Sequence, residues 1–323
     1  MDVDKKKSSV AMLSVVSNAS LVVMKLIIGI VIHSVSVISE AIHSGIDLVA
    51  AIIAYCAVKA AAKPADKDHP YGHGKFENVS GTLEAILIFI AAGWIIYEAW
   101  HKLKFPSPVE KAGFGIGVML VSSLVNWLIS KRLFRIGKET DSVALQADGW
   151  HLMTDVYTSA GVMGGLMLMW GGEKLFPAVN WQWIDPAAAI LVALLIIKAA
   201  YDLTLQSSLD LVDKSLPEEE ALWVENQILK HRDQFRGYHR LRTRKSGAHR
   251  FIEFHLTFKS DTSVAFSHEV GDKITAEIKN HFPQSQVIVH IEPCDWICKP
   301  HCVSGCFLTP EERDVLKVKE KIV

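Results

Sequence analysis

The chain has 323 residues, of which 50% are hydrophobic and 21% are charged. Its mean hydropathy of +0.23 is high for a soluble protein and favours a chain that enters a membrane. The formal net charge is −1 at pH 7, so the chain has no excess of lysine and arginine, and we expect no nucleic-acid partner.

Six mostly apolar stretches are about 20 residues or longer, which is enough to cross a lipid bilayer as helices. They are Val10–Ile32, Val35–Ala61, Gly81–Trp100, Gly113–Leu133, Ala144–Trp170 and Pro186–Leu205. Lysines and arginines precede the first stretch and follow the second and the fourth. The positive-inside rule therefore predicts a cytoplasmic N-terminus, although the lysines after the third stretch run against it. Six spans return the C-terminus to the cytoplasm as well.

Two of these stretches carry the same short motif, a histidine followed four residues later by an aspartate. The pairs are His43 with Asp47 and His151 with Asp155. Side chains at i and i+4 share one helix face, and ionisable groups at membrane depth usually mark function. Two imidazoles and two carboxylates together form a set that suits tetrahedral Zn²⁺. Isolated polar residues that join packed helices are the alternative reading, which a second matching pair disfavours.

The chain changes character after about residue 210. A predicted helix from Leu216 to about Arg232 is followed by two strands, a second helix and a third strand. The later elements are His239–Lys245, Arg250–Phe258, Ser267–Phe282 and Val287–Glu292. This order predicts a small α+β domain with helices on one face of a sheet. We expect a transmembrane domain over residues 1–207, a cytoplasmic domain over 208–295 and a cysteine-containing tail over 296–323.

Three further segments, together with the two His/Asp pairs, resemble the cation diffusion facilitator family, in particular its bacterial zinc/iron-efflux branch. The segments are PADKDHPYGHGK at 64–75, LRTRKSG at 241–247 and VIVHIEPC at 287–294. The resemblance covers residues 8–295. It implies a homodimer of subunits with six transmembrane helices and a cytoplasmic ferredoxin-like (metallochaperone-like) domain, placed in the bacterial inner membrane. It also implies export of a divalent metal in exchange for protons by alternating access, with His43, Asp47, His151 and Asp155 as the transport site.

The resemblance implies two further metal sites. The loop after the second span offers Asp66, His69 and His73, and three ligands leave one position open. The cytoplasmic domain has residues at the positions of a two-metal site, with glutamate where relatives often have aspartate. These residues are His239, His255, His268, His290 and Glu292. Hydrogen-bonded loop residues and scattered surface histidines are the alternatives; His249 has no counterpart, and we expect it at the surface.

Two other features extend or depart from the family pattern. Lys75 and Asp213 match positions of a charge pair between subunits, and the alternative is two solvated charges that contribute little to stability.

Cysteines recur every four residues near the C-terminus, but Pro300 argues against one continuous helix there. These are Cys294, Cys298, Cys302 and Cys306. Metal binding suits a reducing cytosol better than disulfides do, and an apolar packing role fits the residues as well.

The sequence thus predicts a Zn²⁺ efflux antiporter, with additional Zn²⁺ in a structural or regulatory role. Histidine at position 43 favours Zn²⁺, because oxygen-richer sites suit harder ions. An exporter of Fe²⁺, Mn²⁺ or Cd²⁺ with the same architecture is the alternative, and a membrane metal sensor without transport stays open. A membrane metalloenzyme is disfavoured because the chain has neither a His-Glu-x2-His nor a His-x2-His-His motif.

Overall fold

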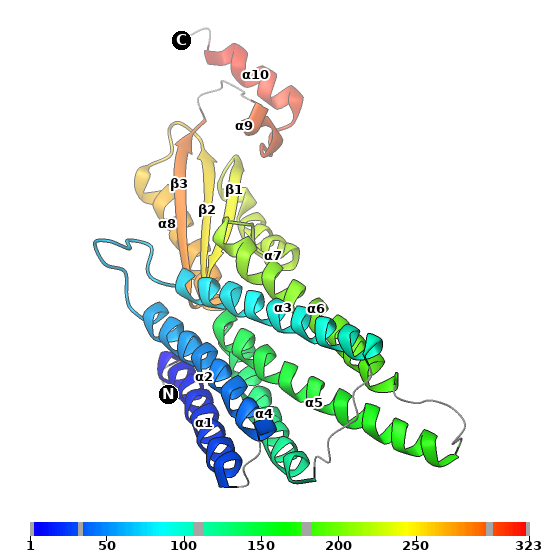
Figure 1. Cartoon of the computed structure of the whole chain (residues 1–323). Coiled ribbons are helices and arrows are strands. Elements are labelled where there is room, and N and C mark those ends of the chain that lie inside the picture. The colour runs from blue at the N-terminus through cyan, green and yellow to red at the C-terminus, as the bar shows by residue number, and fades with distance from the viewer. Residues whose placement is uncertain (1–2, 32–34, 106–112, 176–182, 295–299, 321–323) are drawn as a thin grey trace. The chain divides into compact units, whose positions relative to one another are not determined.

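The computed structural model describes residues 3–31, 35–105, 113–175, 183–294 and 300–320. The chain forms two compact units, Met1–Leu211 and Val212–Val323, which we describe separately. Figure 1 shows the first as a set of long helices and the second as a small sheet with helices.

The described residues of the first unit form six long helices, and each predicted span overlaps one of them. Their bounds are α1 Val3–Val31, α2 Val35–Ala61, α3 Lys75–Lys104, α4 Gly113–Glu139, α5 Val143–Leu175 and α6 Ile184–Leu211. By length and composition, four described segments are apolar enough to cross a membrane: Val3–Val31, Ala41–Ala61, Lys75–Lys104 and Pro186–Leu211. Helices α4 and α5 have 27 and 33 residues, which is also long enough to cross a membrane. The polar residues of α5 include His151 and Asp155.

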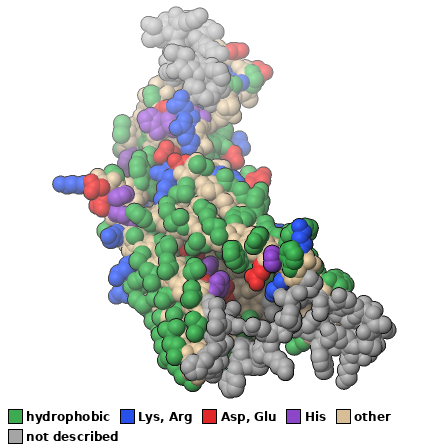
Figure 2. All heavy atoms as spheres, viewed as in Figure 1, with side chains coloured by type: hydrophobic (Ala, Val, Ile, Leu, Met, Phe, Trp, Pro, Cys, Tyr) green, Lys and Arg blue, Asp and Glu red, His purple; other side chains and the backbone are tan. Residues whose placement is uncertain are grey.

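The surface of the helical unit is apolar, and its helix contacts use small residues. Ile27, Ile90 and Trp94 are each more than half exposed, and Figure 2 shows hydrophobic side chains spread over the described part of the helical unit. A continuous exposed apolar surface of this kind fits contact with lipid tails. Ala85 and Ala92 are buried together with α6 residues, as expected where membrane helices approach closely.

The second unit has the predicted α-β-β-α-β order. Its elements are α7 Glu218–Lys230, β1 Gly237–Ser246, β2 His249–Phe258, α8 Val264–His281 and β3 Ser285–Pro293. Strand β2 is central, and it pairs antiparallel with β1 and parallel with β3. The expected α+β domain is therefore confirmed.

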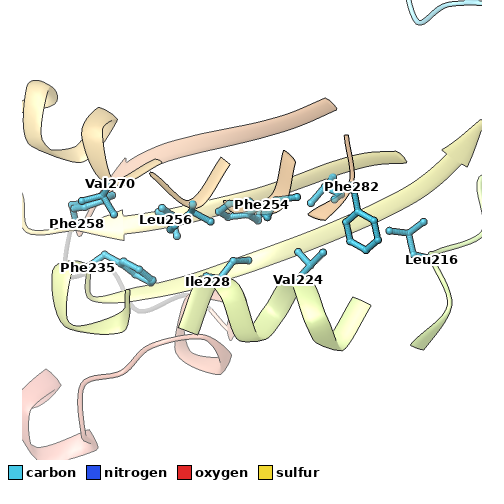
Figure 3. Packing of buried hydrophobic residues seen from close by; sticks show 12 residues of the cluster. Leu216, Val224, Ile228, Phe235, Phe254, Leu256, Phe258, Val270 and Phe282 are labelled. Atoms are coloured by element: carbon cyan, nitrogen blue, oxygen red, sulfur yellow. The ribbon is translucent and has the colours of Figure 1, made fainter. Parts of the chain in front are cut away.

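Helices α7 and α8 cover the same face of the sheet. Val224 and Ile228 lie one turn apart on α7 and pack against Phe254 and Leu256 of β2 (Figure 3). Buried residues of α8 also recur every four positions and join the same core, as Ile274 does. Because side chains alternate along a strand, this leaves His255 on the opposite face of β2.

The C-terminal tail continues as two short helices, α9 Pro300–Ser304 and α10 Pro310–Glu320, and its middle docks on β1. The Tyr238 amide donates to the Gly305 carbonyl at 3.0 Å, and the Phe307 ring packs on Phe235. Only glycine fits at position 305, because a Cβ there would lie 1.5 Å from the Tyr238 carbonyl oxygen.

The cysteines do not share one helix face. Cys294 follows β3, whereas Cys302 lies in α9, which begins at Pro300, and Cys306 follows α9. The structure shows no disulfide among the described cysteines, and Cys298 lies outside the described residues. The structure does not choose between metal binding and apolar packing for this set.

Candidate metal centres

The two His/Asp pairs face each other across α2 and α5. The Nε2 atom of His151 lies 3.2 Å from Oδ1 of Asp47, and Nε2 of His43 lies 3.9 Å from Oδ1 of Asp155. The first residue of one pair thus meets the second residue of the other, as expected for helices that run in opposite directions. The spacing within each helix places the side chains on one face, and the packing of α2 on α5 brings the faces together.

The geometry of this cluster fits a tetrahedral cation. Zinc bonds of about 2.0–2.2 Å would place neighbouring ligand atoms about 3.3–3.6 Å apart. One ligand atom each from His43, Asp47 and Asp155 lies within 4.8 Å of the others, and His151 joins through its 3.2 Å contact with Asp47. Ligand atoms as far as 4.8 Å apart would have to approach by up to about 1.5 Å to reach that spacing. The transported cation would then replace contacts that these groups now make with one another.

The cluster has a buried and an open part. The side chains of Asp47 and His151 are 5% and 10% exposed, whereas the His43 side chain is 55% exposed. The cluster therefore has one rigid side and one accessible ligand, as an exchanging cation requires. Asn126 of α4 donates from Nδ2 to Oδ2 of Asp155 at 3.2 Å. Sequence reasoning missed Asn126, although an asparagine within the apolar stretch Gly113–Leu133 was the available signal.

The loop between α2 and α3 brings Asp66, His69 and His73 together. Asp66 accepts hydrogen bonds from the amides of Asp68 and His69, and its oxygens lie 3.4 Å from His69 Nδ1 and 3.3 Å from His73 Nε2. Gly72 enables the turn with a φ of 83°. Gly74 has ordinary helical angles. The backbone bond from His69 and the nearby imidazoles hold the pKa of Asp66 below its usual value, against a smaller effect of burial.

In the second unit, three histidines stand side by side across the sheet. His239 of β1 pairs in register with His255 of β2, and His255 pairs with His290 of β3. Glu292 lies among them, 3.1 Å from His239 Nε2, 2.8 Å from His255 Nδ1 and 3.5 Å from His290 Nε2. A carboxylate among three imidazoles is a donor set that suits Zn²⁺.

Glu292 is ionised at neutral pH. Burial raises the pKa of its carboxyl, but the hydrogen bond with His255 and the nearby His239 and His290 outweigh that effect. The net pKa of Glu292 is lower than that of a free glutamate. The Glu292 carboxylate is therefore in the ionised form that binds a metal cation.

His268 is placed differently from the other four expected residues of this site. It lies on α8, which packs on the face opposite to the histidine row, and its Nδ1 is 3.0 Å from Asp272 Oδ2. One copy of the chain does not bring His268 to the row, and its assignment stays a prediction. His249 is exposed, as expected.

The predicted charge pair also has contacts within each unit. Lys75 donates to the Leu211 carbonyl at 3.2 Å, and Asp213 lies 3.6 Å from Arg244. A link between Lys75 and Asp213 would involve a second copy of the chain and stays a prediction.

A bundle of membrane-length helices with a buried His/Asp cluster defines an integral membrane protein that handles metal cations. The chain matches the cation efflux transmembrane domain over residues 11–212 and the cytoplasmic domain of cation efflux proteins over residues 216–294. It therefore belongs to the cation efflux family, that is, the cation diffusion facilitators, whose members are transporters and not enzymes. The cytoplasmic match implies a homodimer.

Individual relatives agree with this class. The chain is 34% identical over 262 residues to the uncharacterized transporter sll1263 of Synechocystis, covering 81% of this chain and 82% of that protein. It is 31% identical over 280 residues to the cation-efflux pump FieF of Shewanella oneidensis, covering 87% and 92%. A solved structure described as "Mode of Action of a Putative Zinc Transporter CzrB (Zn form)" is 32% identical and covers 27% of this chain and 98% of that one, with a TM-score of 0.25.

Proposed function

We propose that this transporter exports Zn²⁺ from the cytoplasm in exchange for protons, as a homodimer in the bacterial inner membrane with both termini in the cytoplasm. The transported cation binds His43, Asp47, His151 and Asp155. The observation that carries the proposal is the meeting of these four side chains between α2 and α5 at membrane depth. Their two nitrogen and two oxygen donors favour Zn²⁺ over harder cations.

Proton exchange follows from the ligand chemistry. A metal binds only deprotonated imidazole and carboxylate, so protonation of the ligands releases it. Histidine titrates near neutral pH, which lets a more acidic exterior displace Zn²⁺ and load protons for the return step. Alternating access requires two states of the helices that differ in their affinity for metal and proton.

The other two clusters have supporting roles in this proposal. Asp66, His69 and His73 capture Zn²⁺ weakly, because Asp66 and His69 are about half exposed and only three ligands are offered. The cluster of His239, His255 and Glu292 binds Zn²⁺ structurally or as a sensor of cytoplasmic excess. Replacing His239 and His255 with alanine then reduces transport at limiting zinc, and unchanged kinetics would remove the sensing role.

The test is metal flux into liposomes that contain the purified full-length protein and carry a pH gradient. Zn²⁺, Fe²⁺, Mn²⁺ and Cd²⁺ are compared in separate assays. Asp47→Ala and Asp155→Ala should each abolish flux, whereas Asp202→Ala, which removes an exposed carboxylate of α6, should not.

Each outcome has a distinct meaning. Zinc flux that depends on the gradient and on both aspartates supports the antiporter. Preferential flux of Fe²⁺ or Mn²⁺ would correct the choice of metal, and flux that survives both substitutions would show that the site is misplaced. Metal binding without any flux would indicate a sensor.

A further inference from the structure

A second group of buried ionisable residues lies in the helical unit and takes no part in the transport site. Glu84 of α3 and Asp148 of α5 are both 0% exposed, and their carboxylates are close enough to interact electrostatically. Ser14 of α1, also 0% exposed, lies beside Asp148. Ala85 of α3 and Ala147 of α5, which adjoin the two acidic residues in the sequence, pack in one buried cluster. Polar side chains of three helices therefore lie near one another in the interior of the helical unit.

These groups lack hydrogen-bond partners for most of their polar atoms. Oε1 of Glu84 accepts a bond from Ser80 at 3.0 Å. Among the described residues, Glu84 Oε2, both carboxylate oxygens of Asp148 and Ser14 Oγ have no partner of hydrogen-bond geometry. A buried carboxylate without a partner costs several kcal/mol, and two adjacent ones repel each other as well. A divalent cation between the two carboxylates would remove this cost, as would protonation of one of them.

The position of the pair relates it to the transport path. Asp148 precedes His151 by three residues, which is about 4.5 Å of helix rise, and it also interacts electrostatically with Asp47. On the other side, Glu84 follows Glu77 by seven residues, or about 10 Å. Glu77 is buried at the start of α3 and forms an ion pair with Lys7 of α1 at 3.0 Å. The pair thus lies between the transport site and the N-terminal ends of α1, α3 and α5.

We propose that Glu84, Asp148 and Ser14 form a second intramembrane binding position for the transported divalent cation, on the side of the transport site that carries the N-terminus. Two carboxylates balance a charge of +2, and Ser14 supplies a third oxygen. The proposal rests on the transport function proposed above and adds a second cation-binding site to the transport pathway.

The donor chemistry explains why a cation would move onward. All three donors are oxygens, which bind Zn²⁺ less firmly than a set that includes imidazole, and which suit Mn²⁺ better. A cation held here is held weakly and passes to His151 and Asp47 one helix turn away. Binding that is favourable and yet weak is what passage along a path requires.

Two measurements on the full-length protein test the proposal. The variants are Glu84→Gln and Asp148→Asn, which keep side-chain shape while removing charge, and Asp202→Asn serves as the matched control. The first measurement counts bound Mn²⁺ per protomer by electron paramagnetic resonance in detergent. The second is Zn²⁺ flux into liposomes at subsaturating zinc, together with the zinc affinity of each variant.

We expect each variant to bind one Mn²⁺ fewer per protomer than Asp202→Asn and to lose about tenfold or more in flux. Tight zinc binding at the transport site should remain. Unchanged Mn²⁺ binding would overturn the proposal even if flux falls, because the carboxylates would then act in packing or as proton carriers. Wild-type flux in both variants would overturn it too. If Asp155→Ala abolishes flux while Glu84→Gln and Asp148→Asn do not, the transport function stands and only the second position falls.

Discussion

Asn126 gives the sharpest test of how the transport site is supported. Its amide donates to Asp155 Oδ2 at 3.2 Å, and the side chain is 6% exposed, so water cannot readily replace it. Residues that orient a metal ligand typically change affinity or activity by about 10- to 100-fold when they are removed. This corresponds to about 1.4–2.7 kcal/mol, which agrees with the roughly 1.5–3 kcal/mol of a hydrogen bond to a charged group. We therefore expect Asn126→Ala to weaken Zn²⁺ binding by about 1.4–2.7 kcal/mol.

The assay is competition with a zinc-binding dye on the full-length protein, in a background that carries Asp66→Ala and Glu292→Ala to disable the other two clusters. Ser122→Ala is the matched control, because Ser122 is buried one turn earlier on α4 and its Oγ has no hydrogen-bond partner among the described residues. Equal zinc affinity of Asn126→Ala and Ser122→Ala would refute the reasoning. A loss of helical content in Asn126→Ala alone would assign any change to folding instead.

Three further predictions address selectivity, pH and stability. His43→Asp replaces a nitrogen ligand with oxygen, so the ratio of Mn²⁺ to Zn²⁺ flux in liposomes should rise; an unchanged ratio would show that position 43 does not set selectivity. The lowered pKa of Glu292 means that its ionised form stabilises the fold above pH of about 4.5 and that this contribution disappears as the pH falls through the lowered pKa. Glu292→Gln should accordingly lower the Tm of the metal-free protein at pH 7 and leave it unchanged near pH 3, whereas an equal loss at both would contradict the pKa argument. Leu256→Ala removes a fully buried side chain and should reduce the free energy of unfolding of the second unit by about 2–5 kcal/mol in a denaturant titration; a loss below 1 kcal/mol would mean that the core of Figure 3 is loosely packed.

The elements of the fold could be predicted because their signals are local. Apolar stretches of membrane length located α1 to α6, and the alternation around His255 located β2. The i, i+4 spacing placed His43 with Asp47 and His151 with Asp155 on helix faces without any knowledge of the packing. The cluster of Asp66, His69 and His73 could be predicted for the same reason, because its ligands lie within eight residues of one another in the sequence.

Contacts between distant segments were decided only by the tertiary structure. Asp47 meets His151 across 104 positions of sequence separation, and Asn126 reaches Asp155 from another helix. The sequence offered Glu84 and Asp148 as unrelated acidic residues, and helix packing makes them neighbours. His268 lies on α8, which covers the face of the sheet opposite to the histidine row, so its part in that site stays a prediction. The helical or strand period determines on which face of a helix or strand a side chain lies. Which other helix or strand that side chain contacts depends on how the apolar faces of all the elements are buried together.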